Sequence, residues 1–168
     1  PSRDLIEAVR ILAKAPIYKP IDEWLDTAFE VWETFDLGNQ DRPPASLGIP
    51  TWLYGHEPPT IFATHIAKYF ANSVREDGLV TIARAGIIYT PGSAGTVQEI
   101  FQDATQNHYE TLGEISPMLF FGMNYWTDRI PVVPLLKRMA GNRKYKAMIG
   151  ITDSPEEVIR RIEQHASV

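Results

Sequence analysis

The sequence predicts an α/β protein with a Rossmann-like parallel sheet flanked by helices. From residue 49 onward, short apolar segments alternate with longer amphipathic ones, which is the order that parallel α/β sheets produce. The apolar run at residues 118–122 is continuous, as is typical of a strand buried on both faces of such a sheet. The 168 residues, 44% of them hydrophobic and 22% charged, suffice for one globular domain with a core.

Residues 1–48 are predicted to form an N-terminal helical segment. A first helix is expected over residues 3–14, where apolar side chains gather on one face. A second helix is expected over residues 21–35, because a proline precedes it and apolar side chains recur at three- and four-residue steps. Residues 36–47 are polar, contain two prolines and are predicted as a loop.

Residues 49–168 are predicted to form the Rossmann-like nucleotide-binding region. Its four strands are expected at residues 49–54, 86–90, 118–122 and 147–152. Its helices are expected at residues 60–74, at 79–84 as the end of a helix, and at 96–111, 132–140 and 155–165. The last helix has a clear start, because a capping side chain precedes Pro155 and two acidic residues follow it.

Composition limits the compartment and the partners. The chain has no cysteine, which excludes disulfides and cysteine-ligated metals and fits a cytoplasmic protein. Its net charge of −5 argues against a nucleic-acid partner, since such proteins present a basic face to the phosphates. The sequence shows no apolar run of membrane-spanning length, so no membrane partner is expected.

A glycine-containing turn follows the strand predicted at residues 86–90 and is expected to hold phosphate. The turn and the first turns of the next helix read Pro91-Gly92-Ser93-Ala94-Gly95-Thr96-Val97-Gln98-Glu99. Glycine lets the backbone approach an anion closely, and the helix start directs free amides and a positive dipole at it. No lysine follows Gly95, so the turn is not a Walker A loop. By itself, such a turn also serves as an ordinary strand-to-helix connection in α/β proteins.

The motif resembles the signature Pro-Gly-Gly-x-Gly-Thr-x-x-Glu of the "Lonely guy" (LOG) family of lysine decarboxylase-like proteins. The chain matches every fixed position except one, where Ser93 replaces a glycine, and Arg75 stands near the position of the family's catalytic arginine. The resemblance covers roughly residues 49–165, and the run 70–101 looks like the larger bacterial members and the nucleotide nucleosidases. The family hydrolyses nucleoside 5'-monophosphates to a free base and ribose 5-phosphate and forms dimers. For this chain we expect no cofactor and no metal.

The resemblance implies roles for individual residues. Gly92, Ser93, Ala94, Gly95 and Thr96 would bind the 5'-phosphate of the substrate. Glu99 would stabilise the positive charge that builds on the ribose and orient the attacking water, and Arg75 would position the substrate.

Each of these residues also has a structural alternative. Glu99 can simply be an acid near a positive helix end, and Arg75 can be a solvated side chain paired with Glu76 or Asp77. Arg84 is a rival for the arginine role, but it is expected to face solvent.

The family's first strand–helix–strand unit, with its own glycine signature, has no counterpart in residues 1–48. Either the chain is the C-terminal part of a larger Rossmann domain, or its N-terminal helices replace that unit. We expect the first, with a sheet edge that pairs with an upstream segment or another chain.

Two other functions stay open. The chain can be a non-catalytic sensor of nucleotides or a carrier of a phosphorylated cofactor, which needs the turn but not Glu99 and Arg75. It can also be a catalytically silent part of a dimer or higher oligomer.

The histidines suggest little chemistry. His56 and Glu57 lack the second histidine of a zinc protease, and two prolines follow them, so no metal site is expected. The loop 55–59 that contains them follows a predicted strand and is expected to contact the base or sugar. His65 and His108 are expected to be packed or capping side chains on helices.

Overall fold

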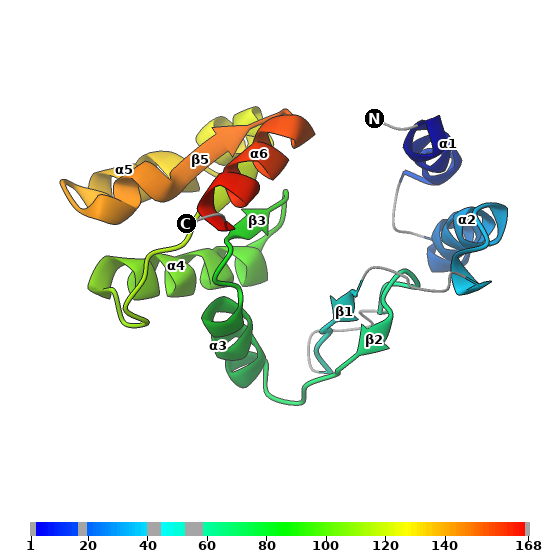
Figure 1. Cartoon of the computed structure of the whole chain (residues 1–168), viewed down its shortest axis with the longest axis horizontal. Helices are drawn as coiled ribbons and strands as arrows, with labels where there is room; N and C mark the ends of the chain where they lie inside the picture. The colour runs from blue at the N-terminus through cyan, green and yellow to red at the C-terminus, as the bar shows by residue number, and fades with distance from the viewer. Residues whose placement is uncertain (1–2, 17–19, 40–44, 53–58, 167–168) are drawn as a thin grey trace. The chain divides into compact units, whose positions relative to one another are not determined.

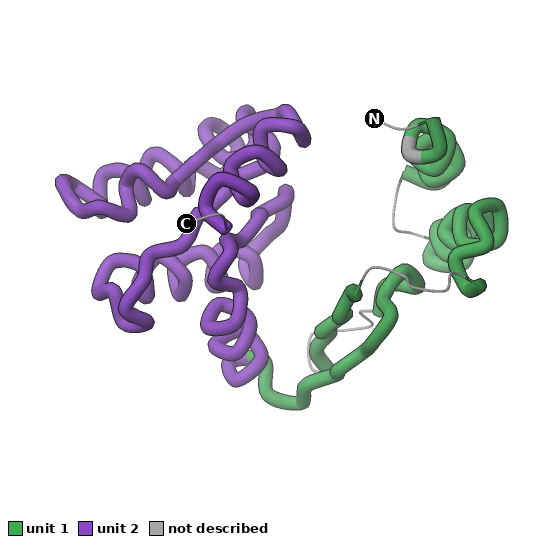
Figure 2. Tube along the Cα trace, in the orientation of Figure 1, with its two compact units in different colours: residues 1–72 green, residues 73–168 purple. Residues whose placement is uncertain are grey.

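The computed structural model describes residues 3–16, 20–39, 45–52 and 59–166 (Figure 1). The chain divides into two compact units, Pro1–Asn72 and Ser73–Val168 (Figure 2). The division predicted after residue 48 lies inside the first unit and stays a prediction. The predicted α/β class, with parallel strands flanked by helices, is confirmed.

The first unit begins with the two predicted helices. Helix α1 (Arg3–Leu12) and helix α2 (Ile21–Thr34) pack against each other. The buried side chains of α2 are Thr27, Ala28 and Val31. Of these, Ala28 and Val31 belong to the predicted apolar stripe. A short 3-10 helix, η1 (Leu37–Asn39), follows α2 within the predicted loop.

The rest of the first unit is a small parallel sheet that differs from the prediction in two places. In the described part of the strand predicted over residues 49–54, only Thr51 forms a bridge, and the strand itself lies at residues 47–48. Strands β1 (Leu47–Gly48) and β2 (His65–Ile66) pair in parallel, and Thr51 and Tyr69 continue the pairing as a bridge. The helix predicted over residues 60–74 is therefore absent, and α3 (Asn72–Ile82) begins only near its end. The apolar spacing of residues 61–70 fits a helix, but hydrogen bonds to the distant β1 segment decide the conformation.

The second unit is built on a three-stranded parallel sheet in the order β3-β4-β5. Its strands are β3 (Ile87–Tyr89), β4 (Met118–Phe121) and β5 (Ile149–Thr152), within one or two residues of three predicted strands. The register places Ile87 opposite Met118 and Met118 opposite Ile149. Helix α4 (Ala94–Tyr109) connects β3 to β4, as predicted.

The core of this unit lies between one face of the sheet and helices α4 and α5 (Val132–Ala140). Its fully buried side chains include Ile100, Phe120, Trp126 and Leu136. Trp126 belongs to an unpredicted π-helical segment, η2 (Tyr125–Arg129), and its indole Nε1 donates to the carbonyl of Phe121 at 3.1 Å. A 3-10 segment, η3 (Lys144–Met148), takes the place of the first residues of the predicted last strand.

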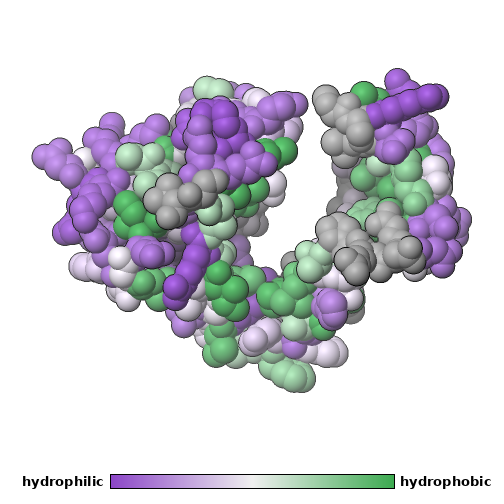
Figure 3. All heavy atoms as spheres, in the orientation of Figure 1, coloured by the Kyte–Doolittle hydropathy of each residue, from purple (hydrophilic) through white to green (hydrophobic). Residues whose placement is uncertain are grey.

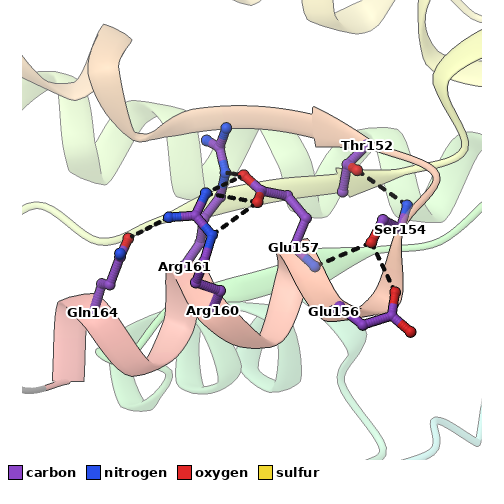
Figure 4. A network of polar contacts seen from close by, with 7 residues as sticks. All are labelled: Thr152, Ser154, Glu156, Glu157, Arg160, Arg161 and Gln164. Carbon is purple, nitrogen blue, oxygen red and sulfur yellow. Dashed lines mark hydrogen bonds and ion pairs between the residues drawn. The ribbon is translucent and has the colours of Figure 1, made fainter. Parts of the chain in front are cut away.

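Helix α6 (Pro155–Ala166) contacts β4 and β5 (Figure 1). Its start has the predicted cap, because the Ser154 hydroxyl accepts a hydrogen bond from the Glu157 amide at 3.2 Å (Figure 4). The Glu157 carboxylate also accepts hydrogen bonds from Arg160 and Arg161, and these interactions lower its pKa. A side chain at Gly150 would meet the guanidinium of Arg161, so the glycine in β5 makes room for that side chain.

Candidate active site

The turn between β3 and α4 holds the glycine motif, and Gly92 occupies a place that no side chain can fill. A Cβ on Gly92 would lie 2.1 Å from the Thr96 Oγ1 atom and 2.8 Å from its Cβ. The Gly92 carbonyl in turn accepts a hydrogen bond from the Tyr125 hydroxyl at 2.6 Å. Thr96 and Tyr125 thus fix the backbone of the turn from two sides. The role of Tyr125 carries no local sequence signal, because it lies 33 residues from Gly92.

The start of α4 presents backbone amides. The first hydrogen bond of the helix runs from the Val97 amide to the Ser93 carbonyl at 3.0 Å, so the amides of Ala94, Gly95 and Thr96 have no acceptor within the helix. Ser93 is the N-cap residue and makes no side-chain capping bond. Ser93, Ala94 and Gly95 are exposed to solvent. An anion can therefore reach the positive end of the helix dipole at this turn.

The structure brings the two predicted catalytic residues together from different helices. The Nη2 atom of Arg75, near the start of α3, lies 3.1 Å from the Oε1 atom of Glu99 in α4. The Arg75 side chain is 13% exposed and that of Glu99 is 26% exposed. Both groups are therefore partly shielded from water, while Glu99 keeps access to a ligand.

Arg75 also lies near its neighbour in the sequence. Its Nη2 atom is 3.9 Å from the Oε1 atom of Glu76, whose side chain has no exposed surface. The other Glu76 oxygen, Oε2, accepts a hydrogen bond from the Gln98 side chain. Asp77, the second partner considered for Arg75, instead accepts a hydrogen bond from Gln102 at 3.1 Å.

A pocket of about 270 Å³ opens beside this pair. Its walls come from α3, β3 and the start of α4, and they include the predicted residues Thr96 and Glu99. The other lining residues are Leu79, Val80, Ala83, Ile87, Ile88, Tyr89 and Thr90. The volume is close to the lower end for ligand pockets, roughly 300 Å³, and an apolar wall with a few polar groups is the usual lining.

A buried acid, Asp103, is hydrogen-bonded to Tyr89 of the pocket wall. The Tyr89 hydroxyl donates to the Oδ2 atom of Asp103 at 2.7 Å, and Asn107 donates to Oδ1 at 3.0 Å. Burial raises the pKa of Asp103 from 3.8 to about 6, against the lowering effect of the hydrogen bond from Tyr89. Burial and the neighbouring Asp103 also raise the pKa of Tyr89. No signal in the sequence points to this pair, because Asp103 stands where a helix would bury an apolar residue.

The remaining candidates contribute less. Arg84 is exposed, as predicted. His108 packs edge-on against Tyr145, as expected of a structural histidine, while His65 lies in β2 rather than on a helix. His56 and Glu57 lie outside the described residues, as does most of the loop expected to contact the base. Within the described part of the chain, no group of three acidic or histidine side chains is arranged as a metal site.

Comparison with models of known protein families and with curated proteins finds no match. The family resemblance therefore rests on the motif and on Arg75. Among the helices that the structure describes, none is both long and apolar enough to cross a membrane.

Proposed function

We propose that this protein hydrolyses the N-glycosidic bond of a nucleoside 5'-monophosphate and releases a free base and ribose 5-phosphate. The observation that carries the proposal is the contact between Arg75 and Glu99 at 3.1 Å, beside a turn suited to phosphate. The two residues are 24 positions apart in the sequence. Glu99 belongs to the motif that resembles the LOG family, and Arg75 stands upstream of it, near the position of the family's catalytic arginine.

The turn supports the binding of the 5'-phosphate. The open amides of Ala94, Gly95 and Thr96 provide hydrogen-bond donors, and the helix dipole favours a negative charge at the same place. Gly92 keeps the backbone free of a side chain on the strand side of the turn. A phosphate held here would place the attached ribose within reach of Glu99, one turn along the helix.

Glu99 and Arg75 would act on the ribose. As the bond between the anomeric carbon and the base nitrogen breaks, the electron pair leaves with the base and positive charge builds on the sugar. The Glu99 carboxylate would stabilise that charge and orient a water molecule toward the anomeric carbon. The water oxygen forms the new bond, and its released proton balances the one that the base takes up. Arg75 would hold Glu99 and the substrate in the positions that the reaction requires.

The pocket supports a place for the base. Its apolar residues from α3 and β3 adjoin Thr96 and Glu99, so a planar ring attached to the ribose can enter it. We propose that Tyr89 and Thr90 limit its depth from the β3 side.

The Glu99→Gln variant separates catalysis from binding. It keeps the size of the side chain and removes the charge, so turnover should fall by roughly 100-fold or more while nucleotide binding is retained. Base release is measured by chromatography over a panel of nucleoside 5'-monophosphates, and binding by calorimetry. Glu110→Gln, at the far end of α4, is the matched control and should keep wild-type turnover.

Unchanged base release in Glu99→Gln would contradict the proposal. Binding without release in the wild type would instead favour a nucleotide sensor or a carrier of a phosphorylated cofactor.

A further inference from the structure

Three polar contacts join α3 to α4 beside the candidate site. In chain order along α3, they are Arg75 to Glu99, Glu76 to Gln98, and Asp77 to Gln102. The middle contact differs from the other two, because the Glu76 side chain is completely buried.

A buried carboxylate is costly unless charge or hydrogen bonds compensate it, so the surroundings of Glu76 show what it holds. Its Oε1 atom lies 3.9 Å from the Nη2 atom of Arg75, and its Oε2 atom accepts a hydrogen bond from Gln98. Arg75 precedes Glu76 in α3, and Gln98 precedes Glu99 in α4. The Glu76 carboxylate therefore contacts Arg75 itself and Gln98, the residue that precedes Glu99.

We propose that Glu76 is a positioning residue that holds the Arg75 guanidinium in place for the reaction, an inference that rests on the proposed function. The same Nη2 atom of Arg75 lies between two carboxylates, at 3.1 Å from Glu99 and 3.9 Å from Glu76. When Glu99 acts on the ribose, Glu76 remains as a fixed partner of Arg75. The hydrogen bond from Gln98 keeps the adjoining part of α4 at a constant distance from α3.

This role is distinct from a merely structural link between helices, and an exchange of side chains separates the two. The Glu76→Gln/Gln98→Glu double variant retains one amide and one carboxylate across the two helices, but moves the negative charge away from Arg75. A structural link is restored by the exchange, whereas the positioning of Arg75 is not. Gln102→Ala is the matched control, because it removes the outer contact to Asp77 without touching Arg75.

The experiment compares the full chain with Glu76→Gln, the double variant and Gln102→Ala. It measures thermal unfolding, kcat and KM for base release, and the NMR signal of the Arg75 Nε–Hε group. We expect kcat to fall by roughly 10- to 100-fold in both Glu76 variants, because small displacements of a catalytic group have effects of this size. KM should stay within about twofold of the wild type, because the phosphate turn is intact. The double variant should recover thermal stability, and Gln102→Ala should keep wild-type kcat.

The NMR signal distinguishes the failure of this inference from the failure of the proposed function. In the wild type the Arg75 signal should be separated from those of exposed arginines, and it should move toward them in both Glu76 variants. An unchanged Arg75 signal in Glu76→Gln, or recovery of kcat together with stability in the double variant, would overturn the positioning role. If the wild type releases no base, the proposed reaction is wrong, and the Arg75 signal alone decides whether Glu76 holds this side chain.

Discussion

Gly92 shows how a single hydrogen atom in place of a side chain shapes the site. The Thr96 side chain occupies the space where a Cβ on Gly92 would lie, and Tyr125 holds the Gly92 carbonyl at 2.6 Å. The Thr96 hydroxyl and the backbone of the turn therefore approach each other more closely than any other residue at position 92 would permit. Gly95 is different, because a Cβ there would meet no atom within 4 Å.

The Gly92→Ala variant should consequently lose both stability and nucleotide binding. The added methyl group forces Thr96 or the turn to move, at a cost of roughly 1–3 kcal/mol in the free energy of unfolding. Urea denaturation measures this cost, and calorimetry measures binding. Gly95→Ala is the control for stability, because alanine has open space there and favours the helix. Equal stability of the two variants would contradict the close approach between Gly92 and the Thr96 side chain.

At the residue scale, the turn and Glu99 could be singled out through the motif and Arg75 through the resemblance, and their roles stay predictions. The contacts of Glu76, Tyr125 and Asp103 could not be foreseen. The motif is contiguous, so its residues are visible in the sequence. The others act through contacts with residues far along the chain, and a buried glutamate in Arg75-Glu76-Asp77-Gly78 looks like a solvated acid until α4 is placed against it.

At the scale of elements, α4 and α6 show two kinds of helix start. The Ser154 hydroxyl caps α6 by accepting the Glu157 amide, within the network of Figure 4. Ser93 occupies the same position before α4 but makes no side-chain capping bond, which leaves the first amides of α4 available to a ligand. A capped start stabilises a helix, and an uncapped one can bind an anion.

This difference predicts losses of stability of different size for two serine-to-alanine changes. Ser154→Ala should lower the free energy of unfolding by about 1 kcal/mol, because an amide of α6 loses its acceptor. Ser93→Ala should change stability much less, since no capping bond is lost. Chemical denaturation of both variants provides the measurement. A larger loss in Ser93→Ala than in Ser154→Ala would contradict the assignment of the two starts.

Elements were predictable where one local signal dominated. The strand–turn–helix order of β3 and α4, the apolar run of β4 and the cap of α6 all lie within short segments. The segment that forms β2 was predicted wrongly, because its apolar spacing fits a helix equally well and only its pairing with β1 decides. The π-helical segment at residues 125–129 contains the fully buried Trp126, and no periodicity of apolar residues reveals it.

At the scale of the whole molecule, the second unit contains the candidate site and a sheet in which β3 is an edge strand. Among the described strands, β3 pairs only with β4, and Ile88 in β3 is 49% exposed. Exposed apolar side chains in this unit also include Val74, Ile82 and Ile159, and Figure 3 shows hydrophobic side chains at the surface among hydrophilic ones. The predicted pairing of this edge with an upstream segment or another chain, and the predicted dimer, remain predictions.

The buried Asp103 gives the fold a defined dependence on pH. Its pKa is raised from 3.8 to about 6 in the folded state, so the folded protein holds this proton more tightly than the unfolded chain does. The resulting stabilisation is full below pH 3.8 and is lost as the pH rises through about 6. The shift corresponds to about 3 kcal/mol in the free energy of unfolding.

The Asp103→Asn variant isolates this contribution, because asparagine does not titrate and can still accept the Tyr89 hydroxyl. The free energy of unfolding of the wild type minus that of the variant should fall by up to about 3 kcal/mol between pH 4 and pH 7. Urea denaturation at several pH values measures this difference. A difference that stays constant over this range would show that Asp103 is not the titrating group.

The proposed reaction cleaves the bond between base and ribose. The most direct measurement incubates the wild-type protein with nucleoside 5'-monophosphates and quantifies the free base and ribose 5-phosphate together by liquid chromatography and mass spectrometry. We expect the two products to form in equal amounts from at least one nucleotide. Release of inorganic phosphate with an intact nucleoside, or recovery of every nucleotide unchanged, would contradict it.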